Sequence, residues 1–419
     1  MRPAVPTAYD AVCEELDRRR RVDLGFERID ALLRALGDPQ LALRVVQVVG
    51  TNGKGTTTLA LASGLEEAGH PSGAYLSPHV LSYTERVWVR GSYVSEEEFA
   101  AGMDAAIRAA DENDILATQF ELLTAGALGM FRDAGLSWAV LEAGLGARHD
   151  ATSAARPGAV VLTNVSLDHT EYLGETVEDI AREKLASLRP GARLVLGTED
   201  LRVREVAGGE TTRAGAELVR VGDVGEEEIS ALGFGPYAAR DVGLGFFAAE
   251  ILLGRALSHG DRKKAARRVR GALPGRFEEF VLEGLPVVVD GGHNPEGLAA
   301  TFEAVRARYG GRALAVVFGA LRDKDVAGML GLVEEEAAYI YLTRPGGSGG
   351  RAAEPEDLSR EYDPRGTSGE RAVVVEEPVE ALKAAVDGVR GVDGVVLVTG
   401  SLYTAAGVLG VLREEDGRG

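Results

Sequence analysis

The sequence predicts an α/β protein of two domains, because apolar runs typical of buried parallel strands alternate with helical segments along the chain. Its 419 residues exceed what one hydrophobic core usually organises. We expect residues 1–274 to form a doubly wound, mostly parallel sheet with a P-loop-type phosphate-binding turn. Residues 275–419 should form a smaller, Rossmann-like α/β domain. Pro274 and Gly275 mark the predicted boundary.

Composition excludes several classes of function. The formal net charge of −19 argues against a nucleic-acid partner bound through a broad basic surface, although a local basic pocket could still bind anionic substrates. The single cysteine, Cys13, excludes an internal disulfide framework and indicates a reducing compartment. Without an apolar signal core or an uncharged apolar run of about 18 residues, we expect a cytoplasmic protein with no membrane partner.

The N-terminal elements follow from periodicity. Residues 8–37 are predicted to be helical, and the β-branched run Val45–Val49 is a buried strand. A glycine-spaced loop then leads into a predicted helix over Thr56–Ala68, which Gly69 ends. A short strand follows over residues 72–76, and the alternation from Arg86 to Arg90 predicts an exposed strand.

The remaining elements continue the α/β alternation, except that residues 200–232 are acidic and too weakly patterned to predict an element. Residues 344–370 read as a polar loop. Helices are predicted over residues 96–110, 117–131, 177–188 and 237–257, and another follows Asp290 and runs through Tyr309. Strands are predicted over residues 138–142, 160–164, 193–197, 286–290, 313–319, 339–342 and 395–399.

The loop that begins at Gly50 is the strongest functional signal. Glycines let backbone N–H groups close around phosphate oxygens, while Lys54 supplies a full positive charge at a helix N-terminus. The hydroxyl of Thr56 is placed to bind Mg²⁺. The strict pattern G-x-x-x-x-G-K-[ST] is not met, because Val48 replaces its first glycine and Gly55 follows the lysine. An ordinary glycine-rich turn is therefore the alternative.

Three further residues carry possible chemistry. Glu142 ends an apolar strand, where a carboxylate can bind Mg²⁺ beside a phosphate loop, although a solvated glutamate is the simpler reading. His169 follows another strand and is a second candidate ligand, against a purely structural role. Lys184 lies on the apolar stripe of its helix, four residues from both Ile180 and Leu188, so it should face inward unless it snorkels to the surface.

The segment from Gly50 to Thr56 resembles the ATP loop of the Mur ligase superfamily. Its Lys-Gly-hydroxyl ending is similar to that of the folylpolyglutamate synthase and dihydrofolate synthase branch. The residues from Glu142 to Thr152 resemble that branch's E-x-G-L-G-x-R-x-D-A-T segment. Further similar segments in the same order extend the resemblance over most of the chain: Pro274–Arg276, Asp290–Pro295, Asp323–Asp325 and Thr399–Tyr403.

The resemblance implies an ATP-dependent carboxylate–amine ligase. Residues 1–274 would be a Mur-ligase-like ATP-binding domain, and residues 275–419 a glutamate-ligase domain. The enzyme would add L-glutamate to tetrahydrofolate or another folate, to dihydropteroate, or to both, through an acyl phosphate, and would use ATP and Mg²⁺. Its partners would be these small molecules alone, and we expect a monomer.

The resemblance also assigns roles to individual residues. Lys54, His293 and a carbamylated Lys184 would be catalytic. ATP would be bound by Asn52, Gly53, Lys54, Gly55, Thr56, Asp241, Arg276 and Asp290. Mg²⁺ would be bound by Thr56, Ser77, Glu142 and His169. The pteridine-bearing substrate would contact Gln119, Phe120, Glu121 and Asp150, and the incoming glutamate His293 and Ser401.

The chain departs from the family pattern at several positions. The family's Q-x-x-N reads Ala238 and Asp241 here, which puts a nucleotide contact of the asparagine in doubt. Four other substitutions leave the loop lysine and the expected metal ligands in place: Ala147, His149, Ser153 and Gly292. Two alternatives stay open. The chain could be a Mur-type ligase acting on a cell-wall precursor or another carboxylate, or a nucleotide-binding homologue that has lost catalysis.

Overall fold

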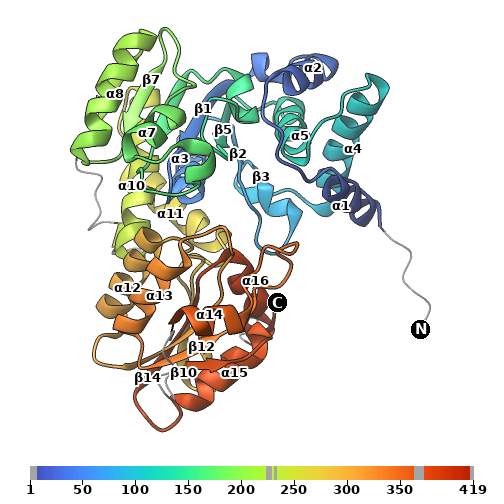
Figure 1. Ribbon diagram of the computed structural model, residues 1–419. Coiled ribbons are helices and arrows are strands. Elements are labelled where there is room, and N and C mark those ends of the chain that lie inside the picture. Colours follow the sequence, from blue (N-terminus) through green and yellow to red (C-terminus); the bar gives the residue numbers. More distant parts are fainter. Residues whose placement is uncertain (1–6, 223–228, 231–233, 363–371, 416–419) are drawn as a thin grey trace. The chain divides into compact units, whose positions relative to one another are not determined.

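The computed structural model describes residues 7–222, 229–230, 234–362 and 372–415 (Figure 1). The chain divides into two compact units, Met1–Ala272 and Leu273–Gly419, and each has its own sheet. Both sheets are mostly parallel and covered by helices, so the predicted α/β class is confirmed. Within the described residues, no helix combines the length and apolarity needed to cross a bilayer.

The first unit is organised around a central strand. Its eight strands lie in the order β4-β3-β2-β5-β1-β6-β7-β8, so β1 is flanked by β5 and β6, both parallel to it. Among the described strands, only β3 runs in the opposite direction; it pairs antiparallel with β2 and with the edge strand β4. The strand bounds are β1 Arg44–Val49, β2 Ser72–Tyr75, β3 Val87–Val89, β4 Ser92–Tyr93, β5 Trp138–Glu142, β6 Ala159–Leu162, β7 Arg193–Leu196 and β8 Glu217–Arg220.

Helices of the first unit form separate packing groups around this sheet. Helices α1, α2, α4 and α5 share one apolar core with β1, β2 and β5. A second core joins α7 and α8 to β6 and β7, while α3 packs against α10 and α11. The bounds are α1 Ala8–Arg18, α2 Glu27–Ala35, α3 Lys54–Glu67, α4 Glu96–Glu112, α5 Gln119–Asp133, α6 Thr170–Leu173, α7 Val177–Lys184, α8 Leu201–Ala214, α10 Pro236–Leu253 and α11 His259–Ala272.

In the first unit, two predictions were wrong in detail, and one stretch without a predicted element proved to be structured. Residues 8–37 form two helices, because Gly25 adopts a φ of 146° immediately before α2. Residues 200–232, for which no element was predicted, contain α8 and β8, and part of this stretch lies outside the described residues. The strand that begins at Val87 is not exposed: Val87 and Trp88 are fully buried, since the edge hairpin packs into the same core as α4 and α5.

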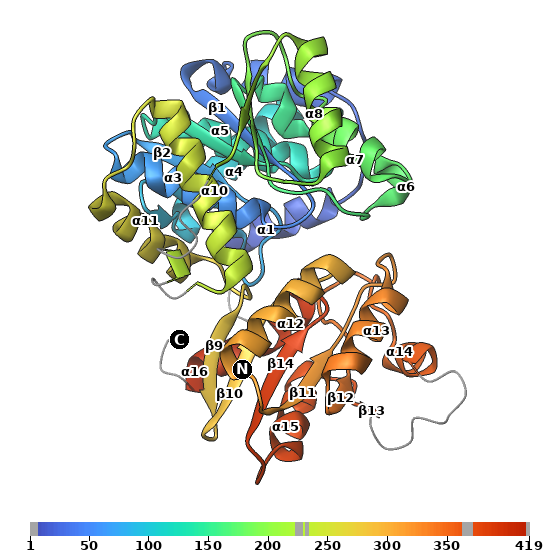
Figure 2. The same ribbon diagram turned by 90° about the vertical axis from the view of Figure 1, so that its left-hand side faces the viewer.

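The second unit contains a six-stranded sheet in the order β13-β12-β11-β14-β10-β9, in which only β9 is antiparallel to its neighbour (Figure 2). Helix α14 falls within residues 344–370, where the sequence predicted a loop. The strands are β9 Glu278–Leu282, β10 Leu285–Val289, β11 Ala313–Phe318, β12 Tyr339–Leu342, β13 Ala372–Val374 and β14 Gly394–Thr399. The helices are α12 Pro295–Tyr309, α13 Val326–Glu336, α14 Pro355–Tyr362, α15 Pro378–Gly388 and α16 Leu402–Glu415.

The packing of α3 against α10 yields a stability prediction. A Cβ atom on Gly245 of α10 would lie 2.6 Å from the Ala60 Cβ and 2.8 Å from backbone atoms of α3. Gly245→Ala should therefore lower stability by about 1–3 kcal/mol. The matched control is Gly209→Ala, at an exposed position of α8 where a Cβ would meet nothing within 4 Å. This variant should be more stable than the wild type by about 0.5–1 kcal/mol. Thermal unfolding of both variants checks this, and equal shifts would contradict it.

Candidate functional site

The loop between β1 and α3 is shaped by glycines and tied to the end of β6. Gly50 has a φ of 152°, and a Cβ there would lie 1.8 Å from Thr163 Oγ1, so only glycine fits. The Thr51 N–H donates to the Asn164 carbonyl at 3.0 Å, and the Asn52 N–H donates to Asn164 Oδ1 at 2.9 Å. These bonds fix the loop at the carboxyl edge of the sheet.

Positive charge gathers at this loop. Helix α3 begins at Lys54, two residues earlier than predicted, and its N-cap is Gly53 with a φ of 78°. Lys54 folds back so that its Nζ donates to the Thr51 carbonyl at 3.0 Å. The ammonium group and the helix N-terminus therefore lie beside the same short loop, which is the arrangement that binds phosphate.

The buried Glu142 connects the phosphate loop to the segment after β2. Strand pairing places Glu142 beside Val48, and its side chain is almost fully buried. A Cβ on Gly55 would lie 3.3 Å from Glu142 Oε2, and the Ser77 N–H donates to that oxygen at 2.9 Å. Gly55, which breaks the strict P-loop pattern, thus lies against the carboxylate. The reading of Glu142 as a solvated strand-end residue is wrong.

The other expected metal ligands are less closely defined. His169 has a φ of 52°, and its ring Nε2 lies 3.9 Å from Asp168 Oδ2. Thr56 is buried in the first turn of α3. Among the described residues, no group of three His, Cys, Asp or Glu side chains could bind a metal ion. The predicted set of Mg²⁺ ligands contains only two residues of these four types, Glu142 and His169. The hydroxyls of Thr56 and Ser77 are its other members, and the whole set stays a prediction.

Lys184 reaches the phosphate loop from α7. It is 5% exposed, and its Nζ donates to the Gly50 carbonyl at 2.7 Å. The predicted inward orientation is confirmed, and the snorkelling alternative is wrong. Helix α7 ends at Lys184, four residues earlier than predicted, so the side chain leaves the last turn and extends towards the end of β1.

Asp241 of α10 borders the same loop. A Cβ on Gly53 would lie 2.3 Å from both carboxylate oxygens of Asp241. The Thr57 hydroxyl donates to the Asp241 carbonyl at 3.1 Å, which ties α10 to the start of α3. The residue that departs from the family pattern is therefore adjacent to the phosphate loop, although a contact with nucleotide stays a prediction.

The predicted substrate residues at the start of α5 have structural contacts of their own. Gln119 Nε2 donates to the Tyr83 hydroxyl at 2.5 Å, and Phe120 packs against Gly144, where a Cβ would lie 2.7 Å from the ring. Glu121 is 3% exposed; it accepts from the Thr118 N–H at 2.7 Å and pairs with Arg28 at 3.1 Å. The Glu121 carboxylate thus caps α5 and neutralises Arg28, and its role in substrate binding stays a prediction.

Asp150 organises the loop after β5. Its Oδ2 accepts from the N–H groups of Gly144 and Leu145 at 2.9 and 3.0 Å, and its Oδ1 accepts from the Thr152 N–H at 3.0 Å. Burial raises the pKa of the Asp150 carboxyl, which these bonds partly offset. The bonds give Asp150 a clear role in fixing this loop, and a direct substrate contact stays a prediction.

In the second unit, predicted residues gather after β10. Asp290 is 3% exposed and accepts from the Phe277 N–H at 2.9 Å, the Gly292 N–H at 2.9 Å and the Thr301 hydroxyl at 2.7 Å. His293 Nδ1 lies 3.1 Å from the Gly291 carbonyl, and a Cβ on Gly291 would lie 2.9 Å from Arg276 Nη1.

Ser401 lies at the end of β14 in the same unit. Its buried hydroxyl accepts from the Thr404 N–H at 3.0 Å. This bond caps the start of α16, which accounts structurally for the serine. Contacts of Arg276, Asp290, His293 and Ser401 with nucleotide or glutamate stay predictions.

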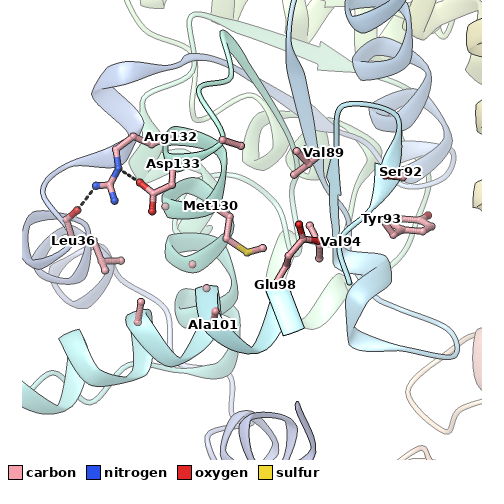
Figure 3. A pocket seen from close by; sticks show the side chains of 15 residues that line it. Leu36, Val89, Ser92, Tyr93, Val94, Glu98, Ala101, Met130, Arg132 and Asp133 are labelled. Carbon is pink, nitrogen blue, oxygen red and sulfur yellow. Dashed lines mark hydrogen bonds and ion pairs between the residues drawn. The ribbon is translucent and has the colours of Figure 1, made fainter. Parts of the chain in front are cut away.

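A separate cavity of about 430 Å³ lies between α4, α5 and the edge hairpin (Figure 3). Its walls are mostly alanine, glycine, valine and methionine, and none of the predicted site residues lines it. Arg132 at its rim donates to the Leu36 carbonyl at 2.6 Å and to Asp133 at 2.7 Å. Arg132 and Asp133 at this rim therefore already have hydrogen-bond partners within the protein.

Comparison with known proteins gives the family. Residues 48–227 match the Mur ligase middle domain, and residues 275–402 match the Mur ligase glutamate ligase domain. The dihydrofolate synthase/folylpolyglutamate synthase of Bacillus subtilis is 31% identical over 90% of this chain and 93% of its own length. The chain belongs to the folylpolyglutamate synthase and dihydrofolate synthase family. The dihydrofolate synthase/folylpolyglutamate synthase of Escherichia coli is 34% identical over 94% of this chain and 92% of its own length.

Solved structures of family members have the same fold. Mycobacterium tuberculosis folylpolyglutamate synthase complexed with ADP matches 97% of this chain and 98% of its own, with a TM-score of 0.85 at 27% identity. E. coli FolC in complex with DHPP and ADP matches 98% of this chain and all of its own, with a TM-score of 0.82 at 29% identity. The Yersinia pestis enzyme complexed with AMPPNP and Mn ion has a TM-score of 0.83 at 29% identity, covering 98% of this chain and 100% of its own.

Sequence reasoning missed the residues that anchor the loop of this family member. The Thr163 hydroxyl donates to the Asn52 carbonyl at 2.6 Å, and Asn164 receives two loop N–H groups. Both residues follow the apolar run of β6. That position was the available signal, because the carboxyl ends of neighbouring parallel strands meet at one edge of a sheet.

The site predicts that Gly53→Ala disables nucleotide binding. The new Cβ would require a left-handed backbone and would clash with Asp241, displacing the loop N–H groups. ATP binding, measured by calorimetry, should weaken roughly tenfold or more, about 1.4 kcal/mol. Gly69→Ala is the control: its φ is 87° but a Cβ there meets nothing within 4 Å. Gly69→Ala should lower the stability of the protein and leave its affinity for ATP unchanged. An equal loss of ATP binding in both variants would contradict the prediction.

Proposed function

We propose that this chain is an ATP-dependent ligase that joins L-glutamate to a folate-type carboxylate, with dihydropteroate and tetrahydrofolate as acceptors. The observation that carries the proposal is the connected set around the phosphate loop. Lys54 begins α3, Gly55 touches the buried Glu142, and Gly50 accepts a bond from the buried Lys184. Membership of the family supplies the substrate class, since the relatives of B. subtilis and E. coli carry both synthase names.

The reaction needs two displacements, because a carboxylate is a poor electrophile. An acceptor carboxylate oxygen attacks the γ-phosphorus, the bond to the leaving ADP oxygen breaks, and an acyl phosphate forms. The glutamate amino group then attacks the acyl carbon; the carbon–oxygen bond to phosphate breaks, and the nitrogen loses a proton. Lys54 and the N–H groups of its loop would bind the transferring phosphoryl group and stabilise its charge.

The residues around Glu142 fit a magnesium ion. Mg²⁺ prefers oxygen ligands, and here a buried carboxylate lies beside Ser77, with the Thr56 hydroxyl in the first turn of the loop helix. Thr56, Ser77, Glu142 and His169 would bind the ion. When bound, Mg²⁺ neutralises phosphate charge during transfer. The complex of the Yersinia pestis relative with AMPPNP and Mn ion supports this assignment.

The central test is turnover with defined substrates. Purified protein with ATP, Mg²⁺ and L-glutamate should release phosphate on addition of dihydropteroate or tetrahydrofolate, and mass spectrometry should detect the glutamylated product. Comparison of the two acceptors decides between the two synthase activities. Release only with a cell-wall precursor would favour the Mur-type alternative, and ATP binding without turnover on any acceptor would favour an inactive homologue. Light scattering in the same buffer tests the predicted monomer.

Lys54→Ala should lower turnover by about 100-fold or more, because the ammonium stabilises charge that develops on the phosphoryl group. The fold should be intact, since the Lys54 side chain is only partly buried and its Nζ donates to the Thr51 carbonyl of the same loop. Lys383→Ala on exposed α15 is the matched control and should keep full activity. Retention of more than about a tenth of wild-type turnover by Lys54→Ala would contradict the phosphate role.

We also propose that Lys184 is carbamylated in the active enzyme. Its nitrogen would attack carbon dioxide, form an N–C bond and lose protons, which changes the buried charge from positive to negative. The remaining N–H can still donate to the Gly50 carbonyl, which lies 2.7 Å from the nitrogen. The new carboxylate would then extend beside the loop and favour a cation there.

Lys184→Ala should therefore lower turnover severely, and added short carboxylic acids should restore part of it by filling the vacated space. Lys184→Met, which fills much of that space, should respond less to the added acids. Intact-mass measurement under gentle conditions should detect the carbamate on the wild-type protein. A free ammonium in a crystal of the active, ATP-bound enzyme would refute the modification.

A further inference from the structure

We propose that Arg86 binds the reacting carboxylate of the acceptor, the group that ATP phosphorylates. The inference rests on the proposed function and deepens it, because it assigns a subsite for that carboxylate. Arg86 ends the short 3-10 helix η2, Tyr83–Arg86, directly before β3. The sequence predicted an exposed strand here, yet the whole residue is only 7% exposed.

The partners of this buried guanidinium are all neutral. Arg86 Nε donates to His79 Nδ1 at 2.8 Å, so that ring nitrogen carries no proton. Arg86 Nη1 donates to the Ser77 hydroxyl at 3.2 Å, and the Arg86 Cζ lies 5.7 Å from the centre of the Tyr83 ring. In the described part of the chain, no carboxylate forms an ion pair with Arg86; the buried pair of Arg28 and Glu121 shows the contrasting arrangement.

A buried charge without a counter-charge is unfavourable, and an anionic ligand would remove that cost. An arginine guanidinium presents its N–H donors in a planar fork whose geometry matches that of a carboxylate. Two of its nitrogens donate to His79 and Ser77, and the hydroxyl of the buried Tyr75 is a further neutral neighbour of the guanidinium. The remaining donor capacity is therefore suited to one carboxylate oxygen, leaving the other oxygen to attack phosphorus.

The position of Arg86 between two parts of the site identifies which carboxylate it would bind. On one side, its partner Ser77 donates to Glu142, which touches Gly55 of the phosphate loop. On the other side, the Tyr83 ring lies 4.1 Å from the His79 ring, and its hydroxyl accepts from Gln119.

Gln119 is the residue expected to contact the pteridine-bearing substrate. An acceptor bound with its aromatic end near Gln119 has to bring its carboxylate towards the γ-phosphate, to within about 3–3.5 Å of the reacting phosphorus. The contacts that run from Gly55 to Gln119 pass through Arg86. Its guanidinium therefore lies along the path that the carboxylate must follow.

The test compares an acceptor with and without its charge. Binding of dihydropteroate and of its neutral carboxamide is measured by calorimetry, with ADP present and absent and Mg²⁺ omitted, for the wild type and Arg86→Gln. The wild type should prefer the acid. Arg86→Gln should bind the acid roughly 10- to 100-fold more weakly, the usual effect of a lost charged hydrogen bond, and should bind the carboxamide as the wild type does. Turnover should show the same loss in kcat/KM for the acceptor, with the KM for glutamate unchanged.

Two further variants make the result specific. Arg90→Gln is the matched control at the other end of β3, because the Arg90 side chain donates to the Ala134 carbonyl at 3.2 Å, away from the predicted site, and the variant should keep the preference for the acid. Arg86→Lys keeps the positive charge but loses the planar array of N–H donors, so its preference for the acid over the carboxamide should be smaller than that of the wild type. This variant replaces Arg86→Gln in the comparison if Arg86→Gln fails to fold.

Several outcomes would overturn the inference. Equal weakening of acid and carboxamide by Arg86→Gln would show that Arg86 merely positions Ser77 and the surrounding loop. An unchanged preference for the acid in both Arg86 variants would exclude a contact with the carboxylate, even with normal wild-type turnover. Conversely, a wild type that ligates glutamate to no acceptor, while Arg86→Gln still loses the preference for the acid, would overturn the proposed function and leave the carboxylate subsite standing.

Discussion

The candidate site of the first unit depends on where β1 ends. Because β1 lies between β5 and β6, the loop that follows it emerges among the ends of both neighbours. Glu142 from β5 approaches Gly55 from one side, and Thr163 and Asn164 after β6 bond to Thr51 and Asn52 from the other. The loop can then present its N–H groups to a phosphate without rearranging, which is the preorganisation that phosphoryl transfer needs.

Local charge in this region opposes the charge of the whole chain. The protein carries a net charge of −19, yet the ammonium group of Lys54 lies beside the phosphate loop, and the buried guanidinium of Arg86 donates to the Ser77 hydroxyl. The acidic surface disfavours nucleic acid, while these few cations serve small anions. Composition gives the net charge of the chain, and it gives no information about which cations lie near the phosphate loop.

Two departures from expected motifs acquire a physical meaning in the structure: Gly55 departs from the strict P-loop pattern, and Asp241 departs from the family pattern. Gly55, at the position of a P-loop hydroxyl, leaves room for Glu142, since a Cβ there would lie 3.3 Å from its carboxylate. Asp241 replaces an asparagine directly against Gly53, so any larger residue at position 53 would collide with it. The second substitution places a carboxylate beside an anion-binding loop, where the cations Lys54 and Mg²⁺ would balance it.

The sequence by itself determined the α/β class, the strand–loop–helix that carries Lys54, and the inward face of Lys184, because these depend on local periodicity and glycine spacing. Only the tertiary structure decided what those residues meet. It showed that Lys184 bonds to Gly50, that Glu121 and Asp150 already have several partners within the protein, and that Arg86 is buried without a carboxylate. Periodicity indicates which face of a helix or strand is buried. The residues that contact that face come from segments far apart in the chain, and they depend on the order of the strands in the sheet.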